Sequence, residues 1–314
     1  MNKLQYYFAG VLFAFSSACF VPASASGNPT QEKHFAVADT LKNTLLWEIS
    51  GNGLDVPSYF YGSMHMLCKE DAFLSENLVS AISNSHKVYL EIDMDDLGQI
   101  FSAFPLMMMR NDTTLKDLLT EEEYDRLAER IKGKMPLPIS MLHRIKPMFL
   151  SALLGQESMS CDEPASIEMM VMQEAKRKNK KIEGLETMKF QAELFDRIPY
   201  GLQAKELLKS LDTTKTQEDR KMMDQLTNAY RTQDLDAIEK LTSLESMGGG
   251  DLMTMLLDDR NKNWVEMFPE IAKQGSTVFC VGAGHLPGKM GVLQLLRDKG
   301  YTVKPVSNRP GKSL

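Results

Sequence analysis

The chain has 314 residues, a formal net charge of −6 at pH 7 and a pI near 5.5, and this acidic balance excludes the basic surface that nucleic-acid-binding proteins use. Beyond its N-terminal region, the sequence has no apolar run near the ~20 residues that a transmembrane helix needs. What remains is long enough to bury one large hydrophobic core or two modest ones.

Residues 1–25 have the three parts of an export signal. A positively charged start is followed by an apolar segment over residues 8–15, and Ala23-Ser-Ala25 fits a signal-peptidase site. An alternative is lipoprotein processing at Cys19, which would anchor the protein through a lipid. We therefore expect an exported protein, periplasmic or secreted, in which residues 26–41 form a flexible segment before the folded domain.

The folded part begins with a predicted β-hairpin. Residues 45–50 are an apolar, β-prone run, Gly51-Asn-Gly53 is a strong turn signal, and residues 58–62 return as the second strand. That strand stops at Gly62, where the missing side chain permits a positive φ or the close approach of another group. His65 follows three residues later, at the carboxyl end of a strand, where open α/β sheets bind ligands.

A βαβ unit is predicted next. Residues 73–84 carry apolar side chains at helical spacing, and residues 87–93 form the following strand. This order is typical of parallel strands joined by a right-handed crossover. Glu91 falls in the buried part of the strand, where a carboxylate is costly unless it is paired, hydrogen-bonded or bound to a metal. Glu91 is therefore a candidate site residue, with a plain ion pair to Arg260 as its structural alternative.

Two stretches over residues 97–175 and 187–250 are interpreted as helical insertions that cover the sheet. Within the first, Thr120-Glu-Glu-Glu123 is a capping box that starts a helix, and Asp162-Glu-Pro164 predicts another helix start. Between the insertions a strand ends at Glu186, which is expected to face the same end of the sheet as the first histidine, with a helix cap as its structural alternative.

The last part of the chain repeats the glycine–histidine motif. After a helix that contains Arg260, residues 276–281 form an apolar strand that breaks at Gly282-Ala-Gly-His285. If this strand neighbours the strand before His65, both imidazoles reach one crevice, where they suit a divalent metal or paired acid and base chemistry. The chain then closes with a predicted helix, strand and tail over residues 290–299, 301–306 and 307–314.

Export leaves three cysteines in a compartment that permits disulfides. Cys280 lies within an apolar strand and is most simply a buried thiol. Cys68 and Cys161 both lie in loops beside predicted helix starts, so a bridge between them is plausible. A metal pair formed by His65 and Cys68 is the weaker alternative.

Five motifs occur in a fixed order along the chain: Gly62-Ser-Met-His65, Tyr89-Leu-Glu91-Ile-Asp93, Gly184-Leu-Glu186-Thr with Gln191, Arg260-Asn261, and Val281-Gly-Ala-Gly-His285-Leu. Over residues 42–306 the sequence thereby resembles the TraB/GumN family, which is related to the Tiki proteins. The resemblance implies an α/β (α+β) fold with a central, mostly parallel sheet, built from two related Gly-x-x-His halves and carrying a large helical insertion.

The resemblance also implies a shared site of His65, Glu91, Glu186, Arg260 and His285. Tiki members are divalent-metal-dependent proteases, so the two histidines, with one of the glutamates, would hold an ion such as Mn²⁺, Co²⁺ or Zn²⁺ that acidifies its bound water. The remaining glutamate would take the proton. The arginine would stabilise an oxyanion or clamp a substrate carboxylate, with a structural salt bridge as its alternative.

Three functions of different classes remain open at this level. The first is a metal-dependent, peptidase-like hydrolase that acts on a peptide or small molecule. The second is a metal-independent esterase in which a histidine activates water. The third is a non-catalytic exported protein that binds a ligand or metal in the same crevice.

Overall fold

The computed structural model describes residues 43–94, 98, 104–132, 139–155, 161, 163–209, 211, 213–244 and 254–310. The predicted signal peptide (residues 1–25, including Cys19) and the segment 26–41 therefore lie outside the described residues. Among the residues that are described, no helix has the length and apolar character needed to cross a membrane.

The described residues form a six-stranded sheet in the order β6-β4-β7-β2-β1-β8. Its strands are β1 (Leu46–Ser50), β2 (Ser58–Ser63), β4 (Lys87–Ile92), β6 (Lys181–Glu186), β7 (Thr277–Gly282) and β8 (Thr302–Val306). Strands β6, β4, β7 and β2 run parallel, whereas β1 is antiparallel to both β2 and β8. The expected α/β class with a mostly parallel central sheet is confirmed.

The first hairpin forms where the turn signal lies. Gly51, Asn52 and Gly53 have φ angles of 78°, 46° and 83°, a left-handed conformation that glycine and asparagine tolerate and most residues do not. Strand β1 consequently pairs with β2 in the register that places Trp47 opposite Phe60.

The two Gly-x-x-His strands are direct neighbours in the sheet. Strand β7 lies parallel to β2, with Gly62 opposite Val281 and Ser63 opposite Gly282. Helix α2 (Glu76–Asn84), which begins after the capping side chain of Ser75, carries the chain from β2 to β4. The two strands of this predicted βαβ unit are parallel, but β7 lies between them.

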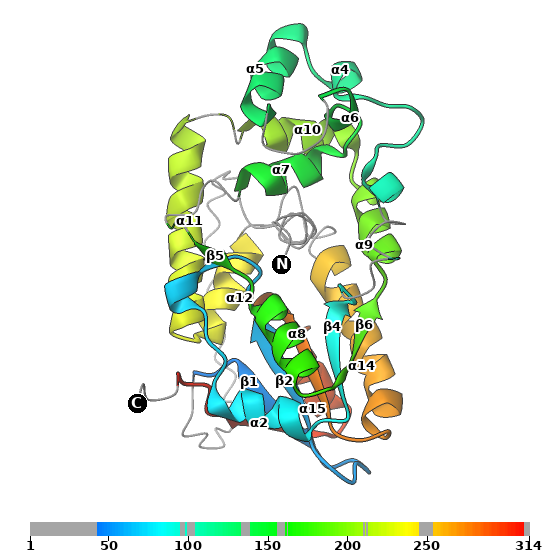
Figure 1. The fold of residues 1–314 in the computed structure, drawn as a ribbon, viewed down its shortest axis with the longest axis vertical. Coiled ribbons are helices and arrows are strands. Elements are labelled where there is room, and N and C mark those ends of the chain that lie inside the picture. The colour runs from blue at the N-terminus through cyan, green and yellow to red at the C-terminus, as the bar shows by residue number, and fades with distance from the viewer. Residues whose placement is uncertain are drawn as a thin grey trace, which may run out of the picture.

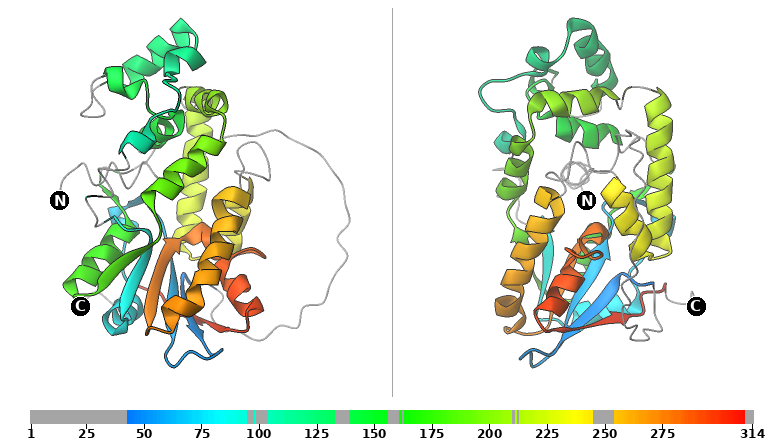
Figure 2. Two further views of the ribbon diagram at one scale, coloured as in Figure 1. Left: turned by 90° about the vertical axis from the view of Figure 1, so that its right-hand side faces the viewer. Right: turned by 180° about the vertical axis from the view of Figure 1, so that it is seen from behind.

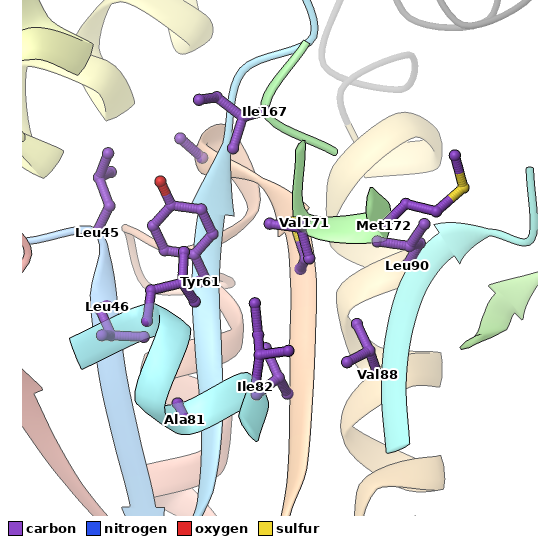
Figure 3. Close-up of a cluster of buried hydrophobic side chains, with 14 of the residues drawn as sticks. Leu45, Leu46, Tyr61, Ala81, Ile82, Val88, Leu90, Ile167, Val171 and Met172 are labelled. Atoms are coloured by element: carbon purple, nitrogen blue, oxygen red, sulfur yellow. The ribbon is translucent and has the colours of Figure 1, made fainter. Parts of the chain in front are cut away.

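Helices cover both faces of the sheet (Figure 1). Helices α2 and α8 (Ile167–Arg177) pack on one face, and α14 (Asp259–Ala272) and α15 (Val292–Asp298) pack on the other. The first face buries side chains of α2, α8 and four strands in one cluster, part of which Figure 3 shows: Leu46, Tyr61, Ile82, Val88, Leu90, Val171 and Met172. The opposite face has an aromatic core: Phe60, Phe279, Trp264, Phe268 and Tyr301.

Further helices lie beyond the carboxyl ends of the parallel strands (Figures 1 and 2). They are α4 (Leu115–Leu118), α5 (Glu121–Ile131), α6 (Ile139–Leu142), α7 (Pro147–Gly155), α9 (Met188–Leu194), α10 (Tyr200–Lys209), α11 (Thr213–Arg231) and α12 (Leu235–Leu244). The end of α11 and α12 are exceptions that reach back to the sheet, where Ala229, Tyr230 and Ile238 join the cluster of the first face. The predicted capping box is present, because Thr120 and Glu123 exchange hydrogen bonds at the start of α5.

Two details differ from the predicted insertion over residues 97–175. Pro164 does not start a helix: Pro164–Ala165 is a short strand, β5, that pairs with β3 (Leu67–Cys68), and α8 begins only after Ser166. Helix α8 also packs against the sheet rather than over its end, because Ile167, Val171 and Met172 join the apolar cluster of the first face. In the predicted tail, Asn308 is buried and bonded to Gln233.

Candidate functional site

Four parallel strands bring the predicted residues to one edge of the sheet. His65 lies two residues beyond β2, Glu91 lies near the end of β4, and Glu186 is the last residue of β6. His285 lies in the short helical turn (Ala283–His285) that follows β7, and Arg260 is in the first turn of α14. Because parallel strands end at the same edge of a sheet, these residues can converge although they are far apart in the sequence.

Arg260 is the centre of this group and is 5% exposed. Its Nη2 donates to Glu91 Oε2 at 2.6 Å and to Glu186 Oε2 at 2.9 Å. Its Nε donates to both Glu186 oxygens at 3.0 Å, and the guanidinium lies 4.8 Å from the ring centroid of Trp264. The planar guanidinium of Arg260 thus joins Glu91 and Glu186, the two carboxylates predicted from the sequence to lie in the site.

Glu91 is bonded from two sides. In addition to the bond from Arg260, its Oε1 accepts from the backbone N–H of Gly282 at 2.7 Å. Burial by itself would raise the pKa of Glu91, but the positive charge of Arg260 outweighs that effect and holds the pKa at about 2. Glu91 is therefore ionised at neutral pH, although it is 4% exposed.

His285 is held as a neutral ring of one tautomer. Asn261 donates through Nδ2 to the carbonyl of Met290 at 2.8 Å, so its Oδ1 faces His285 Nδ1 at 2.6 Å and that nitrogen must carry the proton. His285 Nε2 then accepts from Arg260 Nη1 at 3.2 Å. Burial lowers the pKa of His285 to about 3, and the lone pair of Nε2 faces the centre of the group.

His65 has a similar arrangement with a charged partner. Its Nδ1 lies 2.7 Å from Oε1 of Glu168, and its side chain is 20% exposed. Burial would lower the pKa of His65, but the charge of Glu168, the hydrogen bond to it and the charge of Glu91 together raise it above its ordinary value. The two histidines therefore differ, because one faces an amide and the other a carboxylate.

The two imidazoles meet around Gly282. A Cβ atom placed on Gly282 would lie 3.2 Å from Glu91 Oε1, 3.6 Å from His285 Cδ2 and 3.8 Å from His65 Nε2. Because both distances start from the same Cβ position, His285 Cδ2 and His65 Nε2 cannot be farther apart than the sum of 3.6 and 3.8 Å. All five residues selected from the sequence thus lie in one buried group at the carboxyl edge of the sheet.

Several further side chains belong to the group. Glu168 was not among the selected residues, and Trp264 and Gln191 donate to Glu186 at 2.9 Å each. The cysteines are the sequence signal that leads to Glu168: Cys68 and Cys161 form a disulfide, which brings the segment after Cys161 to the segment after the first Gly-x-x-His motif.

The donor set fits a divalent cation in chemistry and charge. Two imidazoles and a carboxylate suit Zn²⁺ and similar ions, and each ring has its Nδ1 within 2.7 Å of a side-chain oxygen, a neighbour that metal-bound histidines usually have. Glu91, Glu168 and Glu186 place three carboxylates beside one guanidinium, and the His65 imidazole, whose pKa is raised, adds positive charge when it is protonated. In the arrangement described, however, Arg260 is the cation in contact with His285, and the described residues contain no group of three acidic, histidine or cysteine side chains set to hold a metal.

Comparison with known proteins gives a family match over most of the chain. A model described as the TraB/PrgY/gumN family matches residues 45–305. "Metalloprotease TIKI1" of Homo sapiens is 23% identical over 93% of this chain and 68% of its own length, and the Xenopus tropicalis protein of the same name is 22% identical over 83% and 61%. "Metalloprotease TIKI homolog" of Amphimedon queenslandica is 22% identical over 85% and 62%. The chain thus spans about two thirds or less of these relatives, and no solved structure matches it.

Proposed function

The chain belongs to the TraB/PrgY/gumN family, and from that premise we propose that it is an exported, metal-dependent hydrolase of the peptidase-like kind. The relatives described above are named as metalloproteases, which supports the reaction class. The N-terminal signal pattern supports export, and so does the Cys68–Cys161 disulfide, because disulfides persist in oxidising compartments. A lipid anchor at Cys19 is the alternative form of export.

The observation that carries the proposal is the shared orientation of the two histidines. His65 and His285 each have Nδ1 against a buried side-chain oxygen, at 2.7 and 2.6 Å, which directs Nε2 to the opposite side of each ring. Both rings border Gly282, beside the ionised Glu91. Two imidazoles and a carboxylate that border one space are the ligand types that a metal ion or an activated water uses.

In the proposed mechanism His65, His285 and Glu91 hold the ion. When bound, the ion supplies Lewis acidity and a water whose pKa is near neutrality. Arg260 stabilises the negative charge that develops on the oxygen of the attacked carbonyl, since its guanidinium is already oriented in the site. Removing one such donor typically lowers turnover by about 100-fold or more.

Glu186 is better suited to orienting Arg260 than to taking a proton. Both of its oxygens accept from Arg260, and they also accept from Trp264 and Gln191. These bonds engage both oxygens of the carboxylate, and three of them come from the one guanidinium. We therefore assign Glu186 to holding the guanidinium in place, in place of the general-base role expected from the sequence.

One observation favours a second candidate, a metal-independent esterase. His65 faces the carboxylate of Glu168, and a histidine supported in this way can remove a proton from water through Nε2. Arg260 would again stabilise the oxyanion. In this alternative His285 stays a neutral hydrogen-bonding group.

Metal analysis and hydrolysis assays on the purified full-length protein distinguish the metal-dependent hydrolase from the metal-independent esterase. Peptides and simple esters are tested before chelation, after chelation, and after addition of Zn²⁺, Mn²⁺ or Co²⁺. The metal-dependent proposal expects His65→Ala and His285→Ala to lose both bound metal and turnover, while His86→Ala, which changes an exposed histidine away from the site, keeps both. Turnover that survives chelation but is lost in His65→Ala selects the esterase, and metal binding without turnover selects a non-catalytic binding protein.

A further inference from the structure

Glu168 is a buried acid that lies outside the sequence motifs and has no role in the metal-dependent mechanism. It is 5% exposed in the first turn of α8, between Ile167 and Met169, which are equally buried. A carboxylate in such apolar surroundings is costly unless it is paired. Its Oε2 accepts from Ser166 Oγ at 2.8 Å, and its Oε1 lies 2.7 Å from His65 Nδ1.

The two-stranded sheet of β3 (Leu67–Cys68) and β5 (Pro164–Ala165), which we call the β3–β5 clasp, connects the segment that contains Glu168 to the segment that contains His65. Strand β3 follows His65 by one residue and pairs with β5, which ends one residue before Ser166. The Cys68–Cys161 disulfide closes the same pair covalently, and the backbone N–H of Ile167 donates to the carbonyl of Met64 at 3.3 Å. The two segments are thus bound together on both sides of the His65–Glu168 contact.

We propose that Glu168 is the positioning residue of His65, and that the β3–β5 clasp exists to hold the two together; the proposal rests on the proposed function of the site. The carboxylate keeps the proton of the neutral imidazole on Nδ1 and thereby presents the lone pair of Nε2 to the centre. Asn261 does the same for His285 from α14. The site is therefore built from two histidines, each oriented by a different element of the fold.

The orienting role differs from that of an ordinary structural ion pair. An ion pair that only fastened α8 to the sheet would contribute to stability, and either ring nitrogen would serve it. A positioning residue must determine which nitrogen carries the proton. The test therefore needs a readout of the ring itself, measured without any metal or substrate.

The experiment compares Glu168→Met, which keeps the length of the side chain and removes the acceptor, with Glu168→Gln, which keeps an acceptor oxygen. Glu163→Gln is the matched control, because Glu163 pairs with exposed Lys69 on the outside of the same clasp. Nitrogen-15 NMR spectra of the imidazoles are recorded on the metal-free, full-length protein at a pH where the rings are neutral. Zn²⁺ binding is measured by calorimetry on the same samples, together with thermal unfolding.

We expect His65 to be protonated on Nδ1 in the unchanged protein and in Glu163→Gln, and to become a mixture of tautomers in Glu168→Met. Affinity for Zn²⁺ should fall by about 10- to 100-fold in Glu168→Met and by less in Glu168→Gln. A His65 ring that carries its proton on Nε2 in the unchanged protein overturns the proposal, even if Glu168→Met does not fold. So does a folded Glu168→Met with unaltered ring signals and Zn²⁺ affinity. Because the ring signals do not depend on turnover, absence of hydrolysis would contradict the proposed function without touching this result.

Discussion

Replacing Gly282 with alanine places a methyl group in the middle of the proposed site. The φ of Gly282 is −52°, which alanine adopts freely, so backbone strain does not contribute. The added Cβ would lie 3.2 Å from Glu91 Oε1, 3.6 Å from His285 Cδ2 and 3.8 Å from His65 Nε2. Only the contact with Glu91 is tighter than an ordinary van der Waals contact, and a small movement of the carboxylate relieves it.

Stability and turnover should respond differently to this methyl group. The free energy of unfolding should change by less than about 1 kcal/mol, because alanine at a compatible φ stabilises by about 0.4–1 kcal/mol through the unfolded chain, and the one tight contact offsets this. Turnover should suffer more, since Glu91 holds Arg260 at 2.6 Å and any displacement moves both groups. A misplacement of about 1 Å in such a group typically costs about 100-fold, so we expect kcat/KM to fall by about 10- to 100-fold.

Two other glycines provide matched controls for the unfolding and kinetic assays. Gly201→Ala introduces a methyl group with nothing within 4 Å, within α10, and should raise stability by up to about 1 kcal/mol without changing turnover. Gly62→Ala would bring its Cβ to 2.8 Å from Leu286 Cδ1 and 3.1 Å from the Cα of Ala283, and should lower stability by about 1–3 kcal/mol. If Gly282→Ala kept full turnover and Zn²⁺ affinity at unchanged stability, the space beside Gly282 would not be where the chemistry occurs.

Three further substitutions test the electrostatics and the covalent tie. Arg260→Met leaves Glu91 and Glu186 buried without their cation, so urea unfolding at pH 7 should show a loss of about 3–5 kcal/mol. This loss should shrink as the pH falls and Glu91, whose pKa Arg260 no longer lowers, becomes protonated; a loss at pH 7 no larger than at low pH would contradict the buried network. Cys161→Ser opens a bridge between residues 93 apart in sequence and should lower the unfolding free energy by about 2–4 kcal/mol, with no effect of reductant on the variant. Glu183 has a pKa of about 2, compared with 4.5 for the free group, because hydrogen bonds from Lys181, Tyr89 and Lys87 outweigh the effect of burial. Its contribution to the free energy of unfolding is present above pH 4.5 and is lost as the pH falls toward 2. Glu183→Gln should therefore reduce the change in the free energy of unfolding with pH in that range.

Local chemistry explains which parts of the fold were predictable. The turn at Gly51-Asn-Gly53 and the capping box at Thr120 depend on neighbouring residues alone, so the sequence pattern predicts them correctly. The place of β7 between β2 and β4 depends on pairing across more than 180 residues, for which strand patterns hold no local signal. The short strand β5 exists only because β3 is opposite it, and Pro164 by itself favours a helix start instead.

The same distinction applies to the site. His65, Glu91, Glu186, Arg260 and His285 all stand at strand ends or in motifs with a visible pattern, and the ion pair between Glu91 and Arg260 was foreseen only as a structural alternative. Glu168 has no such mark. A serine and a glutamate at the start of an apolar helix are typical of an ordinary helix N-terminus, and only the disulfide partner of Cys68 shows that this helix begins beside His65.

The repetition of Gly-x-x-His has a packing cause as well as a chemical one. The space left by the missing side chain of Gly62 is filled by Leu286 and Ala283, which belong to the second motif's loop. At Gly282 the nearest atoms to the missing Cβ belong to Glu91, to His285 of the same motif and to His65 of the first motif. Gly62 therefore makes room for the loop of the second motif, whereas at Gly282 a methyl-sized space lies among Glu91 and the two histidines. The glycine of the first motif thus serves packing and the glycine of the second serves the site, which is why Gly62→Ala is expected to lower stability and Gly282→Ala to lower turnover.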